Sequence, residues 1–215
     1  LLALVVRSGP VWPGWLHGCR RRDNPVMQPD TPRDNPDPFI ADTVRWLERA
    51  VIGLNLCPFA KAPHIKGRIH HVVSVAGSVP ELTRELQREL LDLQSLPAVD
   101  RETTLLIVPH LLHDFLDFND YLGQAHRLLK SLKLEGEFQI ASFHPRYQFA
   151  GTDVDDITNF TNRSPHPTLH LLREASIDQA VAAFPQAEAI FEANMRTLTD
   201  LGLAGWVQLQ VHPRS

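Results

Sequence analysis

The segment from Thr103 to Val108, T-T-L-L-I-V, is the feature that most constrains the fold of this 215-residue chain. It is a continuous, largely apolar run between turn signals, and this pattern is typical of a strand that is buried on both faces. Such a strand occurs in sheets that carry helices on both sides, because neither face is then left in water. The segment therefore favours an α/β fold.

Helical and strand patterns alternate along the rest of the chain. From Phe39 to Cys57 apolar residues recur at the spacing of one helical face, and Pro58 disfavours helical geometry in the residue before it. Alternation of this kind indicates β-α-β units, so we expect one domain with a mainly parallel sheet of about four strands, an antiparallel edge strand and helices packed on the sheet. The predicted strands are 69–75, 103–108, 138–143 and 168–172, and the predicted helices are 39–57, 80–96, 115–133, 176–184 and 190–201.

The two ends of the chain differ from this pattern. Residues 1–37 contain six prolines and the basic run Arg20–Arg22, and the first Met is Met27, so we expect residues 1–37 to be a disordered or non-native extension ahead of the domain. The single α/β domain is expected to span residues 38–204. Residues 205–215 are expected to be a C-terminal tail, in which the alternation V-Q-L-Q-V suggests a short edge strand.

Composition excludes several functions. The net charge is −4 and the isoelectric point is about 6.3, so the surface lacks the basic character expected of a nucleic-acid-binding or anionic-membrane-binding protein. No apolar run approaches the roughly 20 residues that a membrane-spanning helix needs. The two cysteines, Cys19 and Cys57, do not make a disulfide framework, which favours the cytoplasm.

The long connection from Ser142 to Pro167 is the expected location of a functional site. Long connections inside a compact domain are uncommon and are often functional, and this one is rich in aromatic and charged residues. Parallel strands end at the same edge of their sheet, where ligands of such folds bind. If the loop doubles back without crossing the sheet, the fourth strand is antiparallel and begins at this same edge. Polar side chains from three separate segments then converge there.

The candidate side chains divide into two roles. His144 follows the third strand and is predicted to be a general acid or base, because an unperturbed imidazole titrates near neutral pH. Tyr147 is predicted to assist it at the catalytic centre. Guanidinium groups bind carboxylate or phosphate through paired hydrogen bonds, so an anionic small molecule is the expected ligand. The predicted substrate-binding residues are Arg146, Arg163, Asn162, Ser164 and His110.

Alternative interpretations of these residues remain open. His144 also fits a buried imidazole bonded to backbone, and the two arginines could pair with Asp153, Asp155 or Asp156 to lock the loop. The motif H-x-x-H-D that begins at His110 could hold a metal, but its Asp also fits a helix N-cap, and no metal site is predicted. Cys57 lies among apolar neighbours, which favours a buried structural thiol.

Three segments resemble the bacterial family catalogued as domain of unknown function 1415. They are G-L-N-L-C-P-F-A from Gly53, A-S-F-H-P-R-Y-Q-F-A-G-T from Ala141, and N-R-S-P-H-P-T-L-H-L-L-R-E from Asn162. The resemblance covers residues 39–203, which supports a start at Met27. It implies no established activity, substrate or cofactor.

Three hypotheses of function follow from these residues. The first is a cytoplasmic small-molecule enzyme that binds an anionic substrate at the carboxyl edge of the sheet, with its reaction class unassigned. The second is a non-catalytic module that binds a metabolite or a partner. The third is a metal-dependent hydrolase that uses His110, His113, His144 and the Asp cluster. The cofactor and the oligomeric state are unknown at this stage.

Overall fold

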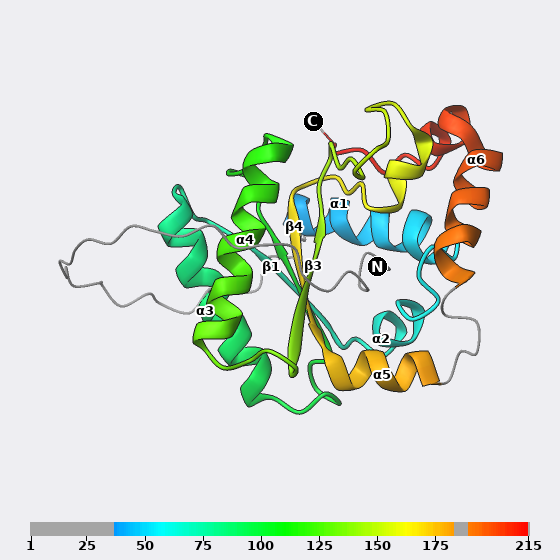
Figure 1. The fold of residues 1–215 in the computed structure, drawn as a ribbon. Helices are drawn as coiled ribbons and strands as arrows, with labels where there is room; N and C mark the ends of the chain where they lie inside the picture. The colour runs from blue at the N-terminus through cyan, green and yellow to red at the C-terminus, as the bar shows by residue number, and fades with distance from the viewer. Residues whose placement is uncertain (1–36, 183–188, 215) are drawn as a thin grey trace.

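The computed structural model describes residues 37–182 and 189–214. Within these residues, four strands form one mixed sheet, and helices cover both of its faces (Figure 1). The strands are β1 (Ile69–Val73), β2 (Thr103–Ile107), β3 (Phe138–Phe143) and β4 (Thr168–Arg173), and the helices are α1 (Pro38–Trp46), η2 (Leu47–Ile52), α2 (Lys61–Ile65), α3 (Val79–Ser95), α4 (Phe115–Ser131), η3 (Ile157–Thr161), α5 (Glu174–Ala182) and α6 (Ile190–Gln208).

The strand order is β1-β2-β4-β3, which differs in part from the predicted sheet. The α/β class and the single domain are confirmed, and β1, β2 and β3 run in the same direction. Only β1 and β2 are parallel neighbours, however, because β4 inserts between β2 and β3 and is antiparallel to both. The predictions of a mainly parallel sheet and of an antiparallel strand at the edge are therefore wrong. The first five residues of β4 are all buried, which favours an interior position for this strand.

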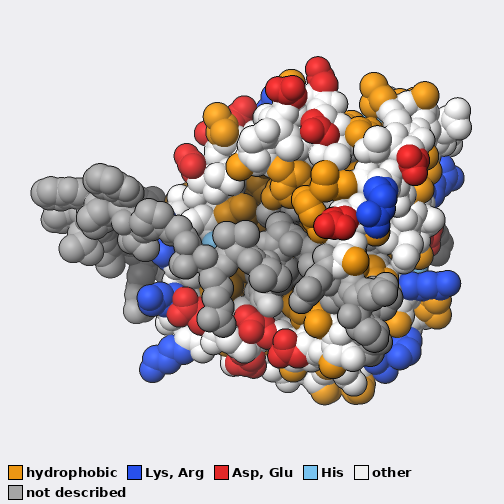
Figure 2. Space-filling model, turned by 45° about the vertical axis from the view of Figure 1, so that its right-hand side comes forward, with side chains coloured by type: hydrophobic (Ala, Val, Ile, Leu, Met, Phe, Trp, Pro, Cys, Tyr) orange, Lys and Arg blue, Asp and Glu red, His pale blue; other side chains and the backbone are white. Residues whose placement is uncertain are grey.

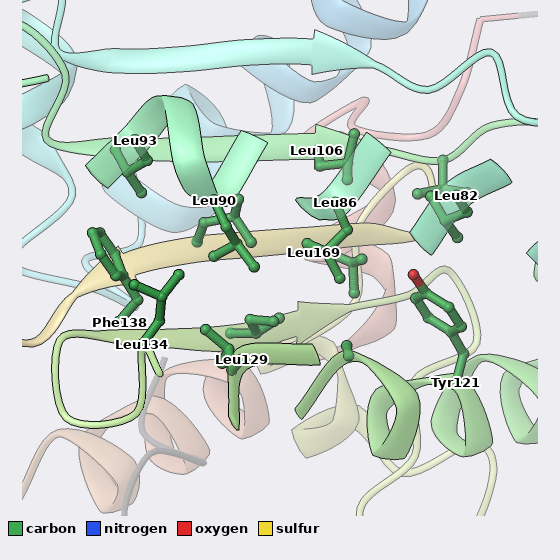
Figure 3. Close-up of a cluster of buried hydrophobic side chains, with 14 of the residues drawn as sticks. Leu82, Leu86, Leu90, Leu93, Leu106, Tyr121, Leu129, Leu134, Phe138 and Leu169 are labelled. Carbon is green, nitrogen blue, oxygen red and sulfur yellow. The ribbon is translucent and has the colours of Figure 1, made fainter. Parts of the chain in front are cut away.

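One face of the sheet packs against α3 and α4. Leucines at helical spacing on α3, including Leu82, Leu86 and Leu90, are fully buried and point toward the sheet (Figure 3). Leu106 of β2 and Leu169 of β4 contact these leucines. Helix α4, which packs on the same face of the sheet, adds its own apolar side chains to this cluster. Asp114 caps α4, because its carboxylate accepts a hydrogen bond from the Leu116 N–H at 2.8 Å.

The other face packs against α1, η2 and α6. Trp46 meets Phe143 of β3 with ring centroids 5.1 Å apart. Phe160 of η3 packs against Trp206 of α6 at 4.9 Å. These aromatic contacts attach the long loop to the helices of the second layer, so the part of the loop around Phe160 belongs to the core.

A buried ionic network ties the end of the chain to α1. Asp42 accepts hydrogen bonds from Arg45 at 2.6 Å, from His166 Nε2 at 3.3 Å and from the backbone N–H of Arg214 at 3.2 Å. Arg45 in turn donates to the backbone carbonyls of residues 210 and 212. Asp42, Arg45 and His166 are all buried, so α1, the long loop and the C-terminal segment are held at one point.

Several element boundaries differ from the sequence predictions. The first helix ends at residue 52 rather than 57, and the short helix α2 occupies a segment in which no helix was predicted. The segment 206–211 is not an edge strand, because α6 continues to Gln208 beyond a kink at Gly202, whose φ is 61°. The predictions for residues 1–36 and the predicted helix end at residue 184 lie outside the described residues. No helix in the described part is long and apolar enough to cross a membrane.

Candidate functional site

The predicted edge of the sheet brings distant segments together. The backbone N–H of His144, just after β3, donates to the carbonyl of Asn162 at 3.2 Å. Because Asn162 lies shortly before β4, the two ends of the long loop are adjacent. The segment after β2 joins them, since the Leu112 carbonyl contacts the His144 ring. The sequence prediction that three segments converge at this edge therefore agrees with the geometry.

His144 has no ring nitrogen left for chemistry in this arrangement. Its Nδ1 accepts from the backbone N–H of Arg146 at 3.0 Å, and its Nε2–H donates to the Leu112 carbonyl at 3.0 Å. Phe115 and Phe118 pack against the ring, which is fully buried. Burial lowers the pKa of His144 to about 4, so the imidazole is neutral at pH 7 and links two loops. Its catalytic role stays a prediction.

Both arginines bind backbone carbonyls, Arg163 within the long loop and Arg146 in the segment after β2. Arg163 donates from Nε to the Tyr147 carbonyl at 3.2 Å and from Nη2 to the Val154 carbonyl at 2.6 Å, and its guanidinium lies 4.2 Å from the centre of the Phe160 ring. Arg146 donates to the carbonyl of residue 113 at 2.6 Å, but its side chain is 61% exposed. Arg163 therefore locks the loop through carbonyl groups, and Arg146 presents charge to solvent.

Two of the remaining predicted residues, Asn162 and Ser164, are also hydrogen-bonded at the ends of the loop. The Asn162 amide donates to the Ser142 carbonyl, whereas its Oδ1 is buried with no hydrogen-bond partner among the described residues. The Ser164 hydroxyl donates to a backbone carbonyl two residues on. Burial raises the pKa of Tyr147, and His110 packs against the ring of Phe39. Binding of substrate by these side chains stays a prediction.

We expect Arg163→Ala to destabilise the protein and Arg146→Ala to leave it almost unchanged. Removing the Arg163 side chain leaves two loop carbonyls without donors and uncovers an aromatic ring, at a cost of about 2 kcal/mol in the free energy of unfolding. Removing an exposed side chain costs less than about 0.5 kcal/mol. Urea unfolding at pH 7 measures both values, and equal values would contradict the structural role of Arg163.

A cavity of about 840 Å³ lies elsewhere, on the second face of the sheet. Its floor is formed near the start of β1, β2 and β3, by residues that include Ile69, Thr103 and Gln139. The walls come from η2, from the segment around Cys57, from α2 and from α5. The cavity is therefore nearer to the opposite edge of the sheet from the predicted site.

The lining of the cavity is mostly apolar, with a small polar group at the floor. His170 Nε2 lies 2.7 Å from the hydroxyl of Thr103, and that hydroxyl donates to the Leu171 carbonyl at 2.6 Å. Burial lowers the pKa of His170 to about 3. Cys57 is a buried thiol whose pKa is raised by burial, in agreement with the structural interpretation of this residue.

Charged side chains also line the cavity. Lys66, at the end of α2, is exposed and has no acidic partner within ion-pair distance among the described residues. Arg68 lies 3.8 Å from the carboxylate of Glu102. On the face drawn in Figure 2, hydrophobic side chains gather near the centre, and charged side chains lie mostly around them.

Sequence reasoning did not single out His170 as a cavity residue. The signal that could have found it is the imidazole at the third position of T-L-H-L-L-R, an otherwise apolar strand. In the described part of the chain, no group of three or more His, Cys, Asp or Glu residues is arranged to hold a metal ion.

The fold and the cavity define a class: an α/β protein with a mixed four-stranded sheet in its described part and a largely apolar cavity beneath one layer of helices. The particular family follows from the sequence. The chain belongs to the family described as protein of unknown function DUF1415, whose model matches residues 38–208. The resemblance noted in the sequence is thereby confirmed. No curated protein and no solved structure matches the chain.

Proposed function

We propose that this protein binds a small organic molecule with an apolar body in the cavity on the second face of the sheet. The observation that carries the proposal is the cavity itself, whose volume of about 840 Å³ lies within the range of known ligand sites. Apolar walls with a few convergent polar groups are the usual composition of such sites.

The charged lining favours a ligand with an anionic end. Lys66 is a cation without an acidic partner among the described residues, so it is available to a carboxylate or sulfonate at the cavity. Binding is better supported than catalysis, because an imidazole with a pKa of about 3 is a weak base at neutral pH. We place the protein in the cytoplasm, as its cysteine content suggests.

We expect the anionic dye 8-anilinonaphthalene-1-sulfonate to bind the folded protein, and Lys66→Glu to weaken this binding roughly five- to tenfold, because the substitution reverses the charge beside the dye. Lys61→Glu is the matched control: Lys61 begins the same helix, α2, is exposed, and does not line the cavity. Its effect should be less than about twofold. Fluorescence titration measures all three affinities.

A cavity-filling substitution tests the location. Ala180 of α5 lines the cavity, and Ala180→Trp would place a large ring in the space that the dye needs. We expect this variant to retain its fold by circular dichroism and to lose dye binding. Dye that binds Ala180→Trp as it binds the wild type would show that the cavity is not the site.

An anionic substrate at the carboxyl edge of the sheet is a second candidate, and the exposed guanidinium of Arg146 favours it. Arg146 Nη2 lies 3.4 Å from the carboxylate of Asp114, and both side chains are exposed. Because an exposed ion pair is weak, an anionic ligand could compete with Asp114 for the guanidinium. An anionic compound whose stabilisation of the protein is lost in Arg146→Ala but kept in Lys66→Glu would select this edge over the cavity.

A further inference from the structure

A residue at the floor of the cavity carries a polar atom that no described residue satisfies. His170 is 9% exposed, and its Nδ1 is buried without a hydrogen-bond partner among the described residues. His170 is one of the residues that line the cavity. Buried polar atoms are almost always paired, and an unpaired one lowers stability until a partner reaches it. The atom therefore indicates a group that arrives from outside the described chain.

The single hydroxyl proton of Thr103 determines which kind of group can pair with Nδ1 of His170. A threonine hydroxyl has one proton, and that of Thr103 is donated to the Leu171 carbonyl. Toward His170 the hydroxyl can only accept, so the imidazole proton is on Nε2. Burial keeps the ring neutral at pH 7, because it lowers the pKa of His170. The Nδ1 atom is then a bare acceptor, which needs a donor.

We propose that His170 determines the specificity of the cavity, and that its Nδ1 accepts a hydrogen bond from a hydroxyl or N–H group on the apolar body of the ligand. This inference rests on the proposed function. A carboxylate is excluded from this position, since it has no proton to donate and would face a lone pair. Together with an anionic end near Lys66, the ligand class is an organic acid that carries a hydroxyl or N–H group on an apolar body.

His71 provides a matched control on the same face of the sheet. It pairs with Leu105 across β1 and β2, and Leu105 pairs with His170 across β2 and β4, so the three residues form one row. The Nε2 of His71 is also buried without a partner among the described residues, but His71 does not line the cavity. A substitution there removes a comparable imidazole without touching the proposed acceptor.

The test compares 4-hexylphenol with its methyl ether, 4-hexylanisole, which has the same apolar body and no O–H. We expect the full-length wild-type protein to bind the phenol roughly fivefold more tightly, which is the ratio that one neutral hydrogen bond supplies. The preference should vanish in His170→Phe and persist in His71→Phe. Calorimetry measures the affinities, and nitrogen-detected NMR of histidine-labelled protein follows Nδ1 of His170, which should shift only with the phenol.

The outcomes separate this inference from the proposed function. If the wild type binds both compounds equally, the role of His170 is overturned while the cavity remains a binding site. If it binds neither compound but still binds the anionic dye, the role of His170 is overturned and the proposed function stands; if the dye does not bind either, both proposals fall. Should His170→Phe fail to fold, the wild-type spectrum decides: a proton on Nδ1, or an Nδ1 signal that the phenol does not move, overturns the inference. An Nδ1 signal that the phenol does not move would mean that Nδ1 of His170 is satisfied by ordered water only.

Discussion

Replacing Asp42 by alanine should lower the free energy of unfolding by about 3–5 kcal/mol, the cost of removing one partner from a buried ion pair. Arg45 would keep its charge in a buried position, where the backbone carbonyls of residues 210 and 212 are its only remaining partners among the described residues. The hydrogen bond from His166 and the backbone bond from residue 214 would also be lost. Urea unfolding followed by tryptophan fluorescence at pH 7 measures the loss.

Two further variants identify the cause of this effect. Glu48→Ala is the surface control: Glu48 lies in η2, its side chain is 54% exposed, and its contact with His64 is an exposed pair, so the change should stay below about 0.5 kcal/mol. The double variant Asp42→Ala with Arg45→Met should recover part of the loss, because no unpaired buried charge remains. A loss below about 1 kcal/mol for Asp42→Ala alone would show that the carbonyls suffice for Arg45.

The second large effect is loss of stability in mild acid. The pKa of His144 is about 4 in the folded protein against an ordinary value of 6.5, so between these values the unfolded chain binds more protons. The contribution of His144 to the free energy of unfolding is fully present above about pH 6.5. It is lost as the pH falls toward 4, by about 3 kcal/mol in total. The pKa values of four further histidines are lowered by burial in the same direction: His70, His71, His166 and His170.

His144→Asn isolates the contribution of this one histidine. The amide side chain can donate and accept but does not titrate, so the variant should lose some stability at pH 7 and lose less on acidification than the wild type. Urea unfolding at pH 7, 6 and 5 gives the slope for each protein. Parallel slopes for wild type and variant would contradict the lowered pKa of His144.

Local structure was largely predictable from the sequence. The limits of β3 agree with the predicted strand 138–143, because an apolar segment between turn signals is a local pattern. The order of the strands could not be predicted from the sequence, because the pairing of β4 with β2 and β3 depends on packing between distant segments. The alternation V-Q-L-Q-V after Trp206 failed as a strand signal because that tryptophan packs on Phe160 from a helix.

The candidate site shows the same division. The convergence of His144 and Asn162 was predicted from the strand assignments together with the assumption that the loop doubles back without crossing the sheet. The backbone partners of His144 and Arg163 could not be foreseen, because they depend on the course of irregular loops. The cavity was missed for a related reason: its walls combine α5, α2 and the segment around Cys57, which only the tertiary fold brings together.

The interior position of β4 has a consequence for how the protein is made. Residues 138–143 have no strand neighbour other than β4 within the described sheet, so β3 cannot join β1 and β2 until residues 168–173 are in place. On the ribosome the nascent chain must therefore extend past residue 173 before its sheet can close. Until then the free edges of β2 and β3 are exposed to other chains, which makes the late arrival of this one strand the step at which misassembly competes with folding.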